Sequence, residues 1–141
     1  MAEAPSFDDW LAIRELTARY NRAFDEADVA GWADTFLPDG HLAVIPSGPV
    51  YRGRDALSAF IRERGWGYLH MTLDPQIELT EGGARQRCNL LLLGRSATGR
   101  PPQLINTGRY DDELVRTPDG WRFTARTVEM DSPPGRIEVA S

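Results

Sequence analysis

The hydrophobic residues of this chain repeat with two different periods, and the change between them lies near the middle of the sequence. In the first part, apolar residues recur every three or four positions, as on the buried face of an α-helix. From about residue 69, four segments rich in β-forming residues alternate with a period of two. Helices followed by an antiparallel meander of strands are typical of an α+β domain.

Three helices are predicted before the meander. The first covers residues 7–25 and follows Ser6 in a pattern close to a capping box. The second is short, begins after Asp28 as its N-cap, and ends in a turn at residues 38–40. The third covers residues 54–64, and Gly65 and Gly67 are expected to end it. Their apolar faces are predicted to carry Trp10, Ile13, Leu16, Tyr20 and Phe24, then Trp32 and Phe36, then Leu57, Phe60 and Ile61.

A short strand is predicted at residues 41–45, and the long strands follow the third helix. Glu81-Gly82-Gly83 and residues 117–120 are turn signals, and residues 96–103 form a longer loop. The four long strands are predicted at residues 69–80, 84–95, 104–116 and 121–131. We expect a curved antiparallel sheet wrapped around the N-terminal helices, forming a cone with an apolar pocket between the two layers.

The length and charge of the chain exclude several classes of protein. Its 141 residues suit a single domain spanning 1–141, with 1–6 and 132–141 as peripheral tails. Sixteen basic against 21 acidic residues give a net charge of −5, which is not the footprint of a nucleic-acid-binding protein. The longest apolar run, Leu90 to Leu93, is too short to cross a membrane, and no signal peptide is visible. We therefore expect a cytoplasmic protein.

The Arg, Cys and His content of the chain excludes further kinds of catalytic and binding site. All 16 basic residues are Arg, so Schiff-base lysine chemistry and a P-loop lysine are excluded, and this composition suggests a GC-rich bacterial genome. The single cysteine, Cys88, cannot form a disulfide within the chain. With only two histidines, His41 and His70, no metal site is expected.

Several motifs distributed along the chain resemble the SnoaL-like family. They are Ile13–Tyr20 followed by Asp25, then Tyr51-Arg52-Gly53-Arg54-Asp55, His70 before Pro75, and Gly108–Arg116 followed by Asp119-Gly120-Trp121-Arg122. The resemblance covers about residues 7–131. It implies the cone-shaped α+β fold of nuclear transport factor two, scytalone dehydratase and bile-acid dehydratases, with an apolar pocket and, often, chemistry that needs no cofactor.

The resemblance also implies a catalytic group, because dehydratases of this family set a Tyr and an Asp of the first helix against a His of the sheet. Tyr20, Asp25 and His70 are at the matching positions. Five residues turn an ideal helix by about 500°, so Tyr20 and Asp25 share a face only if the helix ends or bends near Asp25. Asp25 would orient His70, His70 would transfer a proton, and Tyr20 would donate to an oxyanion.

Structural roles remain open for the same three residues: Asp25 as a helix end, His70 as a core histidine and Tyr20 as plain core. Further residues are candidates for binding a hydrophobic substrate. Asn89 is the polar residue in the middle of an apolar strand, and it is either a substrate anchor or a residue that faces water. Asp111 and Asp112 are expected to face solvent. The substrate-binding candidates are Asn89, Tyr51, Tyr110, His41 and Trp32.

The favoured function is a cofactor-independent lyase or isomerase, similar to a dehydratase, acting on a hydrophobic cyclic or aromatic molecule. One alternative is a cyclase or epoxide-opening enzyme in which Asp25 is the acid or base. The other is a non-catalytic binding module or an oxygenase accessory subunit, which a separation of more than about 6 Å between Asp25 and His70 would favour. Because Leu90–Leu93 places apolar side chains on both faces of one strand, we expect a homodimer, with a trimer as the alternative.

Overall fold

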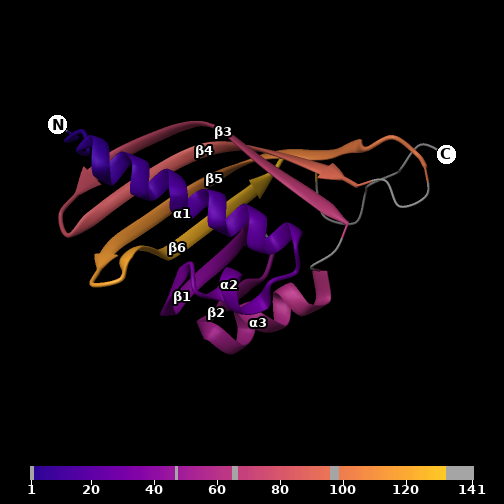
Figure 1. Ribbon diagram of the computed structural model, residues 1–141, viewed down its shortest axis with the longest axis horizontal. Coiled ribbons are helices and arrows are strands. Elements are labelled where there is room, and N and C mark those ends of the chain that lie inside the picture. Colours follow the sequence, from indigo (N-terminus) through magenta and orange to yellow (C-terminus); the bar gives the residue numbers. More distant parts are fainter. Residues whose placement is uncertain (1, 47, 65–66, 96–98, 133–141) are drawn as a thin grey trace.

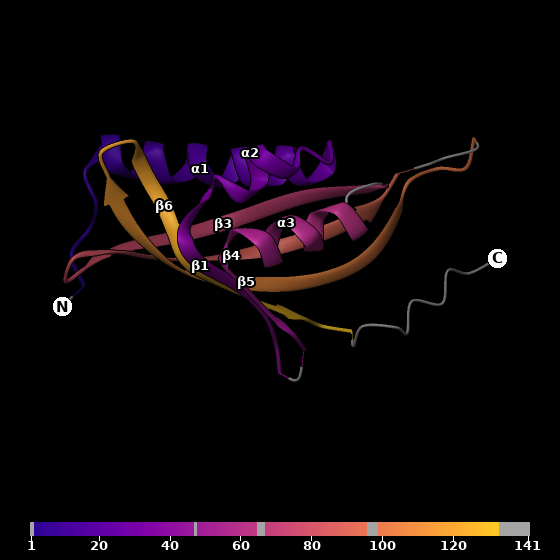
Figure 2. The same ribbon diagram turned by 90° about the horizontal axis from the view of Figure 1, so that it is seen from below.

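The computed structural model describes residues 2–46, 48–64, 67–95 and 99–132, and it shows three helices packed on one face of a curved sheet (Figures 1 and 2). This is the predicted α+β architecture. The elements in chain order are α1 (Phe7–Asp25), α2 (Val29–Ala33), β1 (Phe36–Ile45), β2 (Val50–Arg52), α3 (Gly53–Arg64), β3 (Tyr68–Thr80), β4 (Gly83–Gly94), β5 (Gln103–Thr117) and β6 (Gly120–Met130).

The first helix has the predicted bounds, and local chemistry explains both ends. The Ser6 hydroxyl accepts a hydrogen bond from the Asp9 amide and so caps the start. At the end, Ala27 adopts the left-handed conformation at φ 56°, and the Asp28 amide donates back to the Ala23 carbonyl. This Schellman-type ending stops the helix at Asp25. The carboxylate of Asp25 therefore comes from the last helical residue.

The six strands are ordered β2-β1-β6-β5-β4-β3, with β1 and β6 parallel and every other pair antiparallel. Figure 2 shows the sheet bending around the helices, with α1 lying along it. Strand β3 is an edge strand, so every second backbone N–H along its free side has no partner within the sheet. The last turn of α1 lies beside that edge.

Two predictions about the start of the sheet are wrong. Phe36 is the first residue of β1 rather than part of the second helix, and residues 38–40 lie within the strand instead of ending a helix. The β1–β6 register is irregular between Phe36 and His41, so the Pro-Asp-Gly sequence is accommodated as a bulge. Gly65, predicted to help close the third helix, lies outside the described residues.

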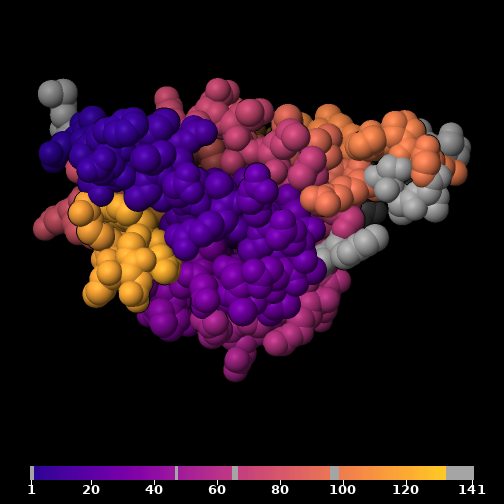
Figure 3. All heavy atoms as spheres, in the orientation of Figure 1, coloured from indigo at the N-terminus to yellow at the C-terminus, as the bar shows by residue number. Residues whose placement is uncertain are grey.

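Large aromatic side chains fill the space between the helices and the sheet. Tyr20 lies with its ring centroid 5.3 Å from Trp32 and 5.8 Å from Phe123. Phe24 and Phe60 continue the cluster at 5.9 Å. In Figure 3, α1, α2 and α3 cover this face, with β3 and β4 emerging beside α1. The centre of the cone is thus a packed aromatic core in the residues described here.

Candidate functional site

Asp25 and His70 form a buried pair between the end of α1 and the start of β3. The His70 Nδ1 atom lies 2.7 Å from Asp25 Oδ1, and each side chain is only 5% exposed. The backbone N–H of His70 also donates to the two Asp25 oxygens, at 3.2 and 3.0 Å. The separation is far below 6 Å, which removes the geometric reason for preferring a non-catalytic module.

This geometry assigns the proton positions of the imidazole. An ionised carboxylate only accepts hydrogen bonds, so the ring nitrogen facing it, Nδ1, carries the proton. In neutral His70 the lone pair is then on Nε2, and no described residue donates a hydrogen bond to that atom. Phe24 packs on the ring at a centroid distance of 4.3 Å and restricts its rotation. The result is an oriented base with one nitrogen available.

A hollow of about 270 Å³ borders this pair between α1 and β3; we call it the pair hollow. Its lining combines the pair with apolar and charged side chains from α1, β3 and the residue after β4. The residues are Ala18, Asn21, Arg22, Asp25, Glu26, Leu69, His70 and Arg95. Space for a small molecule therefore exists beside His70, but at the open edge of the cone rather than in the centre where we expected it.

Tyr20 does not join the Asp25–His70 pair. It is fully buried and contacts Trp32, Phe36, Tyr110 and Phe123. Burial raises the pKa of its hydroxyl, and the Arg126 guanidinium partly opposes that rise. The predicted oxyanion role is incompatible with this position. The 140° offset between positions 20 and 25 explains the outcome, since the two side chains leave α1 on different faces.

The remaining binding candidates divide between the core and the outer face of the sheet. Trp32 and Tyr110 are buried in the aromatic core, and Tyr51 packs on Phe60 at 4.5 Å. None of these three is among the residues that line the pair hollow. The structure therefore does not bring these three residues to the hollow beside His70.

His41 and Asn89 lie on the opposite, outer face of the sheet. Both line an open hollow of about 1010 Å³, the outer hollow, together with charged residues of β4, β5 and β6. Asn89 is exposed and is paired with Leu73 and Arg109, consistent with the alternative that it faces water. Burial, and then the nearby Arg52, lower the pKa of His41. The period-two alternation separates these side chains from His70 by the thickness of the sheet.

The sequence profile of the SnoaL-like domain matches residues 5–127. The chain belongs to the SnoaL-like family. No curated protein is significantly similar to it in sequence.

Solved structures share this SnoaL-like architecture at low sequence identity. A variant of Rv3472 from Mycobacterium tuberculosis, of unknown function, is 28% identical with a TM-score of 0.79, and the match covers 96% of this chain and 84% of that one. ActVI-ORFA from Streptomyces coelicolor is 22% identical (TM-score 0.79; 86% and 96%). A candidate scytalone dehydratase from Novosphingobium aromaticivorans is also 22% identical (TM-score 0.76; 89% and 85%). At such identities the likeness shows the cone fold.

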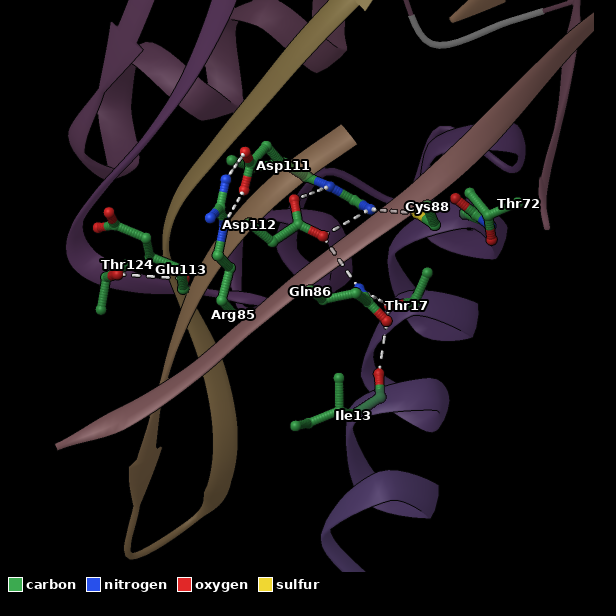
Figure 4. A network of polar contacts seen from close by, with 12 residues as sticks. Ile13, Thr17, Thr72, Arg85, Gln86, Cys88, Asp111, Asp112, Glu113 and Thr124 are labelled. Atoms are coloured by element: carbon green, nitrogen blue, oxygen red, sulfur yellow. Dashed lines mark hydrogen bonds and ion pairs between the residues drawn. The ribbon is translucent and has the colours of Figure 1, made fainter. Parts of the chain in front are cut away.

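The SnoaL-like chain contains a second buried acid–base pair that we did not predict. Asp112 and Arg126 are both 0% exposed, and Arg126 Nε donates to Asp112 Oδ1 at 2.9 Å. Asp112 was expected to face solvent like Asp111, and that expectation is wrong. Tyr110 and Asp112 are two residues apart on β5, so the alternation that turns Tyr110 inward turns Asp112 inward as well. Figure 4 shows Asp112 with Gln86, whose amide donates to Asp112 and to Thr17.

Three aromatic rings enclose the guanidinium of Arg126. Its Cζ lies 3.6 Å from the ring centroid of Tyr110, 4.2 Å from Tyr20 and 4.6 Å from Phe123. Burial lowers the pKa of Arg126, but the Asp112 carboxylate together with Tyr110, Tyr20 and Cys88 raises it above the usual value. Arg126 is therefore a permanent, sealed cation stabilised by one carboxylate and three ring faces. No proton transfer is expected from it.

Sequence reasoning also missed a polar row on α1. Thr17, Asn21 and Asp25 are four residues apart, and all three are buried. Thr17 accepts a hydrogen bond from Gln86, and Asn21 donates one to Thr72. The spacing of four from Asp25 was the available signal, because it places the three side chains on one helix face.

Neither a metal site nor a membrane-spanning helix is found among the described residues. Nowhere in the described ranges do three or more His, Cys, Asp or Glu side chains gather as ligands of a metal ion would. Within the same ranges, each helix is too short or too polar to span a membrane.

Proposed function

We propose that this SnoaL-like protein is a cofactor-independent lyase or isomerase that transfers protons on a small hydrophobic carbonyl compound. The observation that supports the proposal is the 2.7 Å contact between Asp25 and His70 beside the pair hollow. Resemblance to a candidate scytalone dehydratase agrees with a lyase, although the shared fold by itself hosts many functions. A cyclase that used the same proton transfer remains the nearest alternative reaction.

In the proposed step, His70 Nε2 takes a proton from the carbon next to the substrate carbonyl. The C–H electron pair moves to the carbonyl oxygen and gives an enolate, while the imidazole becomes cationic. The proton then returns, either to a hydroxyl that leaves as water or to another carbon. Asp25 stabilises the imidazolium and keeps Nδ1 protonated throughout. Acid–base help of this kind contributes about 10²–10⁴-fold to the rate.

Hydrogen–deuterium exchange at carbon tests this step without knowledge of the natural substrate. The protein is added to 1-tetralone or cyclohexanone in D₂O, and NMR follows the loss of the protons next to the carbonyl. We expect faster exchange than in buffer, and a rate about 10²–10⁴-fold lower for His70→Gln. Ketone binding without accelerated exchange would instead indicate a binding module. Equal exchange by wild type and His70→Gln would remove His70 from the mechanism.

We also propose that the protein forms a homodimer through the outer face of the sheet. Exposed apolar side chains support this, with Met71 44%, Leu73 45% and Leu104 60% exposed. Such side chains favour burial against a partner. Size-exclusion chromatography with light scattering should give twice the chain mass. A monomer at high concentration would contradict self-association and leave the catalytic proposal untouched.

A further inference from the structure

A second hollow lies along the row of polar side chains on α1, on the side away from His70. It has a volume of about 340 Å³, and we call it the amide hollow because Asn21 and Gln86 line it. Thr17, Thr72 and Cys88 contribute to the same walls, and Arg14 is its charged lining residue. Asn21 and Ala18 line both hollows, so the pair hollow and the amide hollow adjoin at these two residues.

Asn21 carries an unsatisfied hydrogen-bond acceptor at this junction. The side-chain Nδ2 donates to Thr72 Oγ1 at 3.1 Å, but the buried Oδ1 has no hydrogen-bond partner among the described residues. Asn21 is 9% exposed. A buried acceptor without a donor is costly, and native proteins satisfy nearly all of them. An orphan acceptor that lines two hollows is therefore explained if a bound molecule brings the donor.

Gln86 lines the same hollow with a second side-chain amide. Its Nε2 donates both to Thr17 Oγ1 at 3.0 Å and to Asp112 Oδ2 at 2.9 Å. The carboxylate fixes this orientation, because the amide oxygen would repel it. The amide oxygen of Gln86 then accepts no hydrogen bond from the described residues. Among the described residues that line the amide hollow, the buried side-chain atom without a partner is thus an acceptor, Asn21 Oδ1.

We propose that Asn21 is a specificity-determining residue, whose Oδ1 accepts a hydrogen bond from a hydroxyl on the far side of the substrate from its carbonyl. The inference rests on the proposed function and names its substrate class: a neutral ring compound with a carbonyl near His70 and a hydroxyl that extends past Asn21. A carboxylate in that place would face the Asn21 acceptor oxygen, and a cation would share the hollow with the Arg14 guanidinium. Both charged classes are therefore disfavoured.

A matched pair of ketones tests this assignment. 6-Hydroxy-1-tetralone differs from 1-tetralone by one hydroxyl on the ring remote from the carbonyl. We expect wild type to bind the hydroxylated ketone about tenfold more tightly, equivalent to about 1.4 kcal/mol, as measured by NMR titration. Asn21→Leu should reduce this preference to about onefold, and Asn21→Asp, which keeps an acceptor, should retain most of it.

The control variant is Asn89→Leu, the same substitution on the outer face, which should keep the tenfold preference. Carbon exchange of 1-tetralone is measured in parallel as a separate readout of the proposed reaction, and Asn89→Leu should leave it within about twofold of wild type. Equal binding of the two ketones by wild type, or an unchanged preference in Asn21→Leu, would overturn the role of Asn21. Absent exchange with an intact binding preference would instead overturn the proposed reaction alone.

Discussion

Two buried acid–base pairs lie on the inner face of the same sheet, and their surroundings differ. Asp25 and His70 meet at an edge strand, beside a hollow, with one imidazole nitrogen that accepts no hydrogen bond from the described residues. Asp112 and Arg126 meet on β5 and β6, away from either edge of the sheet, and three rings seal the guanidinium. Proximity of opposite charges is common to both, so proximity alone does not distinguish a reactive pair from a structural one.

The difference lies in what the basic partner is able to do. Imidazole exchanges a proton near neutral pH, whereas guanidinium keeps its charge under all conditions in a protein. A pair that must move protons needs space for a guest, and a pair that holds strands together needs none. This comparison predicts that removing Arg126 damages the fold, while removing His70 damages the reaction.

The largest expected effect is therefore on stability at Arg126. Arg126→Met leaves the Asp112 carboxylate buried without its partner and should lower the free energy of unfolding by about 3–5 kcal/mol. His70→Gln should lower it far less, because Asp25 still accepts the backbone N–H at position 70. Urea denaturation measures both. The double variant Arg126→Met with Asp112→Leu should recover much of the loss. Similar losses for Arg126→Met and His70→Gln would contradict the structural role assigned to Arg126.

Cys88 lies beside the Asp112–Arg126 pair, so its reactivity measures how well that part of the core stays closed. Its Sγ lies 3.9 Å from Arg126 Nη2, and burial raises the pKa of the thiol to about 11. The reactive thiolate is then scarce at pH 8, so iodoacetamide should label the folded protein at least about tenfold more slowly than the urea-unfolded chain. Because the folded pKa is raised, the stability linked to this thiol is present below its unfolded value and is lost as the pH rises through about 11.

Rapid labelling of Cys88 in the native protein at pH 8 would show that the core around Arg126 opens. Mass spectrometry measures the modification without ambiguity, since the chain has one cysteine. Arg126→Met should increase the native labelling rate, while His70→Gln should leave it unchanged.

The smallest expected loss of stability is at Arg85 and Asp111, an exposed ion pair on the outer face of the sheet. Arg85 Nε donates to Asp111 at 2.8 Å, and the side chains are 42% and 45% exposed. This hydrogen bond holds the pKa of Asp111 below its usual value, so the linked stability is present above about pH 4 and is lost at lower pH. Arg85→Gln should cost less than about 1 kcal/mol, and high salt should reduce that loss. A loss equal to that of Arg126→Met would contradict the role of burial.

The predictable parts of this protein are those governed by local rules. Helix α1 follows from Ser6 at its start and a regular apolar stripe, and the four long strands follow from alternation between turn signals. Phe36 was misassigned because its spacing of four from Trp32 also fits a helix, whereas pairing with β6 makes it extended. Tertiary pairing overrides local preference at such boundaries.

The Asp25–His70 pair was predicted through resemblance, while the Arg126–Asp112 pair depends on register. Arg126 and Asp112 are cross-strand partners in the β5–β6 pairing, and sequence alone does not state that register. The packed centre of the cone was also unpredictable, because alternation indicates which residues face inward but not whether space remains between them. For that reason Tyr20 and Trp32 were assigned to a pocket that their own side chains fill.

The tautomer of His70 shows directly whether Asp25 orients the imidazole as a base. The chain has two histidines, so a ¹⁵N NMR spectrum of the rings contains one signal set for His70 and one for His41, which lies on the other face. We predict that neutral His70 carries its proton on Nδ1, with an unprotonated Nε2 whose signal shifts when 1-tetralone is added, while the His41 signals do not shift. A proton on Nε2 in the neutral ring, or a ketone that perturbs His41 and not His70, would contradict the assignment of His70 as the oriented base.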